Sequence, residues 1–349
     1  MGEEMHYKDV SELSEALGRA GDARELAGLT RGVRAFVAGR AESGDVLDTG
    51  RAAAALYDGL LARAAVLARD RPPGGFCLAA LGSQARGEQF LATDQDNALI
   101  LPDPADAPEA REAWTAFAAR LRDVLAAAGL PPCPKGIMAA TPEWRRTLRE
   151  WREALDAAAD RPDAGGVLLV SLLADVRAVW GDPALAEALA GQVRRHAADA
   201  PLLVRGLARE ALRFAPESGF PGPFSGFGKN HTSLDLKRAA VYPLALGVKA
   251  LALEAGLTET GTVERLDGLV RRGLVGGELG ARLTRAFACV QGLRLRAQAR
   301  ALAAGRAPDN LIERDALPVT DREALRQALH AVAELAAVLE HHFGLAYLT

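Results

Sequence analysis

Two short apolar runs separated by a polar segment constrain the first third of this chain more than any other feature. One run ends in Gly82-Ser83, and the second, residues 95–101, begins within a pair of aspartates, Asp94 and Asp96. Side chains alternate along a strand, so the two carboxylates would project from one face. Like charges this close disfavour each other's ionised form unless a bound cation offsets the repulsion. The segment therefore predicts two strands that meet at a divalent metal site.

The residue types around this pair indicate a hard cation and a phosphate-bearing ligand. Mg²⁺ or Mn²⁺ is held by one or two carboxylates together with waters and substrate phosphates. A glycine before a serine lets a phosphate approach the backbone closely, and the serine hydroxyl and the amides can donate to it. A two-metal site would need one more carboxylate, and Asp175 in LLADVRAVWGD is the best placed. The alternative is that Asp175 pairs with Arg177 at a sheet edge.

Composition narrows the class of protein. The chain has 349 residues and a formal net charge of −3, so it lacks the global positive field of proteins that bind nucleic acid without specificity, and no nucleic-acid partner is expected. Its three cysteines lie far apart, which fits a reducing compartment and offers no zinc motif. The first residues are acidic and no apolar run approaches membrane-spanning length, so we expect a cytoplasmic protein without a membrane partner.

The periodicity of apolar residues predicts an α+β chain in three consecutive parts. A helical lead-in covers residues 1–70, a domain with a small mixed sheet covers 71–215, and an all-helical bundle covers 216–349. Breakers near Gly21 and at residues 42–44 divide the lead-in into two or three helices. Further helices are expected over residues 107–129, 141–159, 183–197, 201–214, 233–256, 261–273, 277–304 and 321–343.

A second candidate anion site follows a segment rich in Pro and Gly. Only five of the 42 basic residues are lysines, and two of them, Lys229 and Lys237, flank a short segment that also contains His231 and Asp235. A helix that begins here could bind an anion at its N-terminus, with Lys237 on a β- or γ-phosphate. The alternative is structural: Ser233 caps the helix and Asp235 stabilises its first turn.

The stretch GSQARGEQFLATDQDNALI resembles the G-S-x-x-R-x-E-x-x-x-x-T-D-Q-D-N-A signature of the DUF294 nucleotidyltransferases. These are relatives of the protein-PII uridylyltransferases and glutamine-synthetase adenylyltransferases in the DNA polymerase β-like superfamily. The resemblance extends over about residues 50–345. It continues through PPCPKGIMAATPEWRRTLREW, LLADVRAVWGDPAL and, in the helical half, SLDLKR, TVERLDGL, AFACVQGLRLRAQ and GRAPDNLI, which look like the family's substrate-binding domain.

The resemblance implies a role for each matching residue. The catalytic and metal-binding carboxylates would be Asp94, Asp96 and Asp175. The nucleotide would contact Gly82 and Ser83, while Arg86 and Glu88 would shape the helix after the Gly-Ser turn and Arg86 could also reach a phosphate. The remaining nucleotide-binding candidates are Thr93, Lys229, Asp235 and Lys237.

The reaction implied by the family is Mg²⁺- or Mn²⁺-dependent nucleotidyl transfer, of the adenylyl or uridylyl type. A nucleoside monophosphate would pass from a nucleoside triphosphate to a hydroxyl of a protein or small molecule, with release of pyrophosphate. A non-catalytic nucleotide-binding regulatory module of the same fold is the alternative. A third reading is an interaction protein whose helical half recruits a partner.

Overall fold

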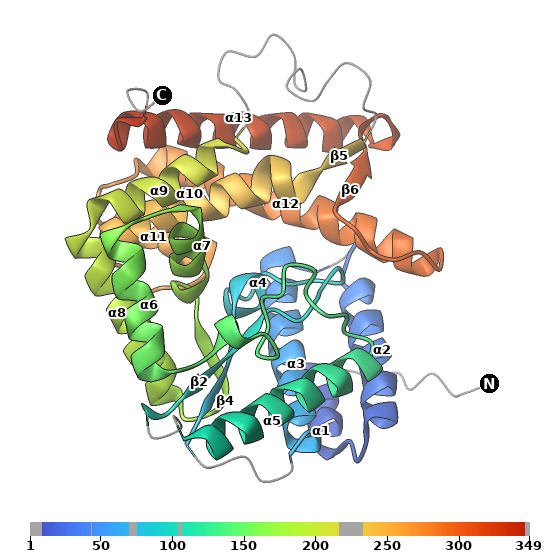
Figure 1. Ribbon diagram of the computed structural model, residues 1–349. Helices are drawn as coiled ribbons and strands as arrows, with labels where there is room; N and C mark the ends of the chain where they lie inside the picture. Colours follow the sequence, from blue (N-terminus) through green and yellow to red (C-terminus); the bar gives the residue numbers. More distant parts are fainter. Residues whose placement is uncertain (1–8, 43, 70–74, 104–106, 216–232, 346–349) are drawn as a thin grey trace. The chain divides into compact units, whose positions relative to one another are not determined.

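The computed structural model describes residues 9–42, 44–69, 75–103, 107–215 and 233–345 (Figure 1). The chain forms two compact units, Met1–Asp156 with Leu172–Val193, and Ala157–Ser171 with Arg194–Thr349. The helical lead-in is part of the first unit, together with the sheet, and residues 194–215 belong to the second unit. Helices with one small mixed sheet in the first unit confirm the expected α+β class.

The sheet of the first unit brings together residues that are distant in sequence. Its strand order is β3-β2-β1-β4. Strand β1 is antiparallel to both of its neighbours, and β2 is parallel to β3. The end of β1 therefore lies beside the starts of both β2 and β4. The strands are β1 (Cys77–Ala80), β2 (Asn97–Leu101), β3 (Arg145–Thr147) and β4 (Arg177–Gly181).

Both central strands are buried on both faces. Every residue of β1 and β2 is buried, which explains why they appear in the sequence as continuous apolar runs without alternation. Helix α3 (Val46–Leu67) contacts β4 and also helix α5 (Pro108–Ala127). The sheet end that carries Gly82 and the two aspartates is thus anchored to a largely apolar interior.

The expected helices of the lead-in are confirmed as α1 (Val10–Arg19), α2 (Ala23–Gly39) and α3. Each begins after an aspartate whose carboxylate accepts hydrogen bonds from amides of the first turn. Such caps satisfy amides that a helix leaves without an intrahelical partner. The three capping residues are Asp9, Asp22 and Asp45.

The helix expected over residues 141–159 begins later than predicted. A single 3₁₀ turn, Pro142–Trp144, leads into β3, and helix α6 starts only at Leu148 and ends at Asp160. Pairing of β3 with β2 overrides the local preference for a helix. A strand of three residues is too short to be recognised from a sequence pattern. Similarly, β2 starts at Asn97, so the two aspartates lie just before the strand and not within it.

The second unit is helical around one central helix. Helix α10 (Tyr242–Glu254) is buried along almost its whole length and contacts α9, α11 and α13. The helix expected over residues 233–256 instead begins with strand β5 (Ser233–Asp235), paired with β6 (Leu311–Glu313), and a π-helical turn, Lys237–Val241. The other helices are α9 (Pro201–Leu212), α11 (Thr262–Arg271), α12 (Gly277–Ala303) and α13 (Val319–His342).

Helix α6 and two further helices each contain residues of both units. The further helices are α7 (Ala164–Leu173) and α8 (Pro183–Asp199), and β4 lies between them in the sequence. None of the helices in the described part of the chain is both long and apolar enough to cross a lipid bilayer.

The pairing of β1 with β4 depends on Gly181. Its φ is +92°, and a Cβ there would lie 1.9 Å from the carbonyl oxygen of Phe76. We expect Gly181→Ala to lower the free energy of unfolding by about 2–5 kcal/mol, because it adds backbone strain and a clash with main chain. Chemical denaturation monitored by circular dichroism would measure the change. Gly18→Ala is the control, since a Cβ at Gly18 meets nothing within 4 Å; equal destabilisation by both variants would contradict the prediction.

Candidate metal and phosphate site

The chain turns sharply where β1 ends, directly beside the aspartates. Leu81 donates its amide to the carbonyl of Asp96 at 3.2 Å, and Gly82 follows with φ of +55°. A Cβ on Gly82 would lie 3.7 Å from Oδ2 of Asp96. Glycine therefore provides the backbone conformation of the turn and leaves open the space next to the carboxylate.

Two carboxylates and a thiol form a compact group at this turn. One ligand atom from each of Asp94, Asp96 and Cys133 lies within 4.8 Å of the others. The aspartates are half-buried and the cysteine is buried. The carboxylate of Asp94 makes no hydrogen bond or ion pair with another residue that the structure describes. Such a pair of oxygen ligands fits a divalent cation, which would offset their mutual repulsion.

The alternation expected from the sequence accounts for the direction of the two carboxylates. Gln95 and Asn97 are buried, whereas the aspartates between and before them remain half-exposed. The Gln95 side chain donates to the carbonyl of Leu130 at 2.7 Å, and the Asn97 carbonyl accepts from the amide of Ala139 at 2.9 Å. These bonds hold the 130–139 segment, which contains the cysteine, against the start of β2.

Cys133 is a member of the site that the sequence did not indicate. Burial, together with the charge and hydrogen bond of Asp96, raises the pKa of its thiol to about 11. The thiol is therefore protonated at neutral pH and donates to Asp96. A neutral thiol is a poor ligand for Mg²⁺, which prefers oxygen. The two carboxylates are the groups in this cluster that fit a hard cation.

Two hydroxyl-bearing residues flank the aspartates. The side chain of Ser83 makes no hydrogen bond with any residue in the described ranges, and it is half-exposed. The hydroxyl of Thr93 accepts a hydrogen bond from Gln89 and lies 3.4 Å from the carbonyl of Asp94. Ser83 is thus available to a ligand, whereas Thr93 shapes the segment before the aspartates.

Asp175 occupies the other side of β1 and has a different partner. It is fully buried, and its Oδ2 lies 2.7 Å from Nη1 of Arg86, while Nε of Arg86 lies 2.6 Å from Glu88. Burial alone would lower the pKa of the guanidinium, but the charges of Glu88 and Asp175 outweigh it and raise the pKa above its ordinary value. Its role as a third metal ligand stays a prediction.

Arg177 does not pair with Asp175, as the alternative from the sequence proposed, but with other groups. It lies 2.7 Å from Asp58 of α3, and it donates to the carbonyls of Ala85 at 3.1 Å and Gln84 at 3.2 Å. These carbonyls end the short helix α4 (Gly82–Ala85), and the Gln84 side chain also donates to Asp58 at 2.9 Å. No sequence pattern indicates Asp58, because its partners Gln84 and Arg177 are 26 and 119 residues away in the chain.

The second candidate anion segment belongs to the second unit. The Asp235 carboxylate accepts from the amide of Arg238 at 3.1 Å. The structural alternative was wrong in detail, because Ser233 and Asp235 both lie in β5: Ser233 caps no helix, and Asp235 precedes the helical turn and is not part of it. Lys237 is exposed at the start of the π-helical turn. Lys229 and His231 lie outside the described residues. A nucleotide-binding role for this segment stays a prediction.

Comparison with family models decides the assignment. Residues 29–165 match a model described as "Putative nucleotidyltransferase DUF294", and residues 201–343 match "Putative nucleotidyltransferase substrate binding domain". The chain belongs to the DUF294 family. The first match contains the Gly82 turn and both aspartates, and the second covers most of the second unit. A search of the curated proteins found no match.

For this DUF294 protein, we expect Asp94→Asn to relieve charge repulsion in the metal-free form and to weaken metal binding. The metal-free variant should be as stable as the parent or more stable by roughly 1 kcal/mol. Saturating Mn²⁺ should raise the unfolding temperature of the parent and leave the variant nearly unchanged. Differential scanning calorimetry measures both effects. The control is Asp267→Asn, which changes an exposed carboxylate on α11. If Mn²⁺ raised the unfolding temperature of Asp94→Asn as much as that of the parent, the site would be ruled out.

Removing Arg86 should be costly because it leaves buried carboxylates uncompensated. We expect Arg86→Gln to lower the free energy of unfolding by about 3–5 kcal/mol. Adding Asp175→Asn to that variant should recover part of the loss, since the uncompensated charge disappears. Urea denaturation would measure both. Arg19→Gln removes an exposed ion pair with Glu15 at 3.7 Å and should change the free energy of unfolding little. An equally small change in Arg86→Gln would show that the buried ion pair does not stabilise the fold.

Proposed function

We propose that this DUF294 protein is a nucleotidyltransferase that transfers a nucleoside monophosphate from a nucleoside triphosphate to a hydroxyl of a protein or small molecule. The acceptor oxygen bonds to the α-phosphorus, the bond from that phosphorus to the bridging oxygen breaks, and pyrophosphate leaves. The hydroxyl proton passes to water. The observation that carries the proposal is the pairing of Asp94 and Asp96 beside the open Gly82 turn.

The carboxylates of Asp94 and Asp96 would hold Mg²⁺ or Mn²⁺. When bound, such a cation neutralises charge on the phosphates and polarises the reacting oxygens. Their half-buried setting supports this role, because electrostatic interactions are stronger where water is partly excluded. Catalysis of this kind depends mainly on positioning and charge stabilisation.

The Gly-Ser turn would hold the phosphates. Gly82 lacks a side chain at the point nearest to Asp96, so a phosphate can approach the backbone there. The Ser83 hydroxyl makes no competing hydrogen bond within the described ranges and can donate to a phosphate oxygen. Helix α4 fixes the direction of both residues.

Arg86, Glu88 and Asp175 contribute by holding the turn. Two of the guanidinium nitrogens of Arg86 already contact carboxylates, which supports a positioning role and not a phosphate contact. Oδ2 of Asp175 contacts Arg86, so a second cation would have to bind its other oxygen or replace the arginine. Mn²⁺ titration of Asp175→Asn can test a two-metal mechanism: one metal site fewer than in the parent would support it.

Turnover is tested with the purified full chain. We expect the protein, given each of the four nucleoside triphosphates with Mg²⁺ or Mn²⁺ and lysate of its source organism, to release pyrophosphate and to transfer α-label to one acceptor. Asp96→Asn should lower the rate at least about a hundredfold without loss of folding. Asp267→Asn should retain the parent rate. Transfer by Asp96→Asn at the parent rate would overturn the proposal, and metal-dependent nucleotide binding without transfer would favour the non-catalytic regulatory module.

A further inference from the structure

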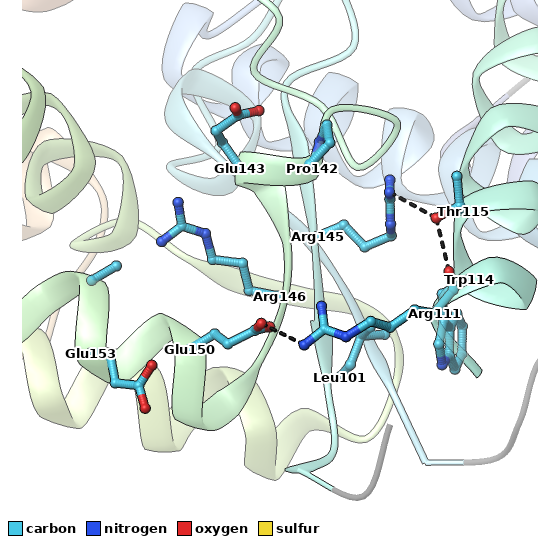
Figure 2. Close-up of a pocket in the computed structure, with 11 residues that line it drawn as sticks. Leu101, Arg111, Trp114, Thr115, Pro142, Glu143, Arg145, Arg146, Glu150 and Glu153 are labelled. Atoms are coloured by element: carbon cyan, nitrogen blue, oxygen red, sulfur yellow. Dashed lines mark hydrogen bonds and ion pairs between the residues drawn. The ribbon is translucent and has the colours of Figure 1, made fainter. Parts of the chain in front are cut away.

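A pocket of about 620 Å³ lies on the β3 side of the first unit, away from the aspartates (Figure 2). Its walls come from α5, the 3₁₀ turn, β3 and α6, and Leu101 at the end of β2 also lines it. Asp96 precedes the start of the same strand, so the two places are about 16 Å apart along β2. The volume is typical of a small-molecule site. The pocket is therefore distinct from the proposed catalytic site.

One pair of charges in the pocket is already neutralised. Arg111 of α5 lies 2.6 Å from Glu150 of α6, as Figure 2 shows. Glu150 also accepts from the amide of Thr147 at 2.8 Å. Ion pairing and these hydrogen bonds lower the pKa of the Glu150 carboxyl against the effect of its burial. This pair joins the two helices across the pocket and leaves little charge for a ligand.

The two arginines of β3 form no close ion pair with a described residue, although the charge of Glu143 acts on Arg145. Arg145 donates to the carbonyl of Ala139 at 2.7 Å and to the hydroxyl of Thr115 at 3.0 Å. The guanidinium of Arg146 lies 5.3 Å from the ring centroid of Trp151, on the opposite side of β3 from Arg145 (Figure 2). Within the described residues, neither forms an ion pair. Arg146 in particular keeps its hydrogen-bond donors available.

A carboxylate on the rim is also available. Glu143 is exposed, lines the pocket, and makes no hydrogen bond or ion pair with the described part of the chain. Trp114 in the wall is fully buried, and its indole Nε1 has no hydrogen-bond partner among the described residues. The wall thus presents no open ring face for a nucleobase and holds one unsatisfied donor.

The balance of charges selects the class of ligand. Three arginines and three glutamates line the pocket, so a polyanion such as a nucleotide would meet repelling carboxylates. A ligand with one negative and one positive group would match Arg146, which has no ion pair with a described residue, together with the exposed Glu143. An arginine fork binds a carboxylate in a bidentate manner, and a carboxylate binds an ammonium group.

We propose that this pocket binds a small zwitterion of the free amino-acid class, with its carboxylate on Arg146 and its ammonium group on Glu143. The ligand occupies a site separate from the metal and the phosphates, so its binding does not depend on the proposed catalytic function. The remaining volume accommodates the ligand's side chain.

The test is calorimetric titration of the purified full chain with the protein amino acids one at a time. For each one that binds, the N-acetylated and the amidated forms are titrated as well. We expect at least one amino acid to bind, and both modified forms to bind about tenfold more weakly or worse. Arg146→Gln and Glu143→Gln should each weaken binding to a similar degree, while Asp96→Asn should leave it unchanged.

Arg122→Gln is the control. Arg122 of α5 pairs with Asp123 at 2.7 Å, and neither residue lines the cavity, so its loss should leave affinity intact. Glu143→Gln keeps the proposal testable if Arg146→Gln fails to fold, because Glu143 is exposed. Absence of binding by every amino acid, equal binding of the N-acetylated form, or tighter binding of inorganic phosphate would each overturn the proposal.

Discussion

The pairing of β1 with two antiparallel neighbours is the constraint on which the site depends. Because β2 and β4 both run opposite to β1, their first residues must lie on either side of the point where β1 ends. The chain leaves β1 at Gly82, so the glycine turn lies between Asp96 and Asp175 without any special interaction to bring them there. Backbone hydrogen bonds alone thus assemble three segments that are up to ninety residues apart.

Electrostatic contacts then fix what the backbone has assembled. Arg86 holds Asp175 and Glu88 on one side of the turn, and Gln95 and Asn97 hold the cysteine segment on the other. Asp94 differs from these groups, because its carboxylate makes no hydrogen bond or ion pair with another described residue and lies next to that of Asp96. A cation from solution would offset the repulsion between the two carboxylates.

The sequence predicted the parts of the fold that local patterns determine. The helices of the lead-in follow from their apolar spacing, and the turn follows from Gly82 and Ser83. Strands β3 and β5 escaped prediction because three residues carry too little pattern, and only pairing with a distant strand stabilises them. The direction of Asp94 and Asp96 was predictable from alternation alone, as the burial of Gln95 between them illustrates.

The contacts of the site were predictable only where the partners are close in sequence. Arg86 and Glu88 form such a pair. Cys133 and Asp58 could not be found, since their roles arise from loops and helices that meet only in three dimensions. The arrangement of Asp175 with Arg86 in place of Arg177 has the same origin, because Arg86 and Asp58 are both distant in sequence from the residues with which they pair.

Arg177 also has a consequence for the thermodynamics of ligand binding. By contacting Asp58 and the last carbonyls of α4 together, it joins a long helix, a strand and the Gly82 turn into one body. The conformational entropy of the turn is then lost when the chain folds, and not when a ligand binds. A ligand of the proposed kind would therefore meet a preorganised turn, and its phosphate contacts would contribute nearly their full free energy to affinity.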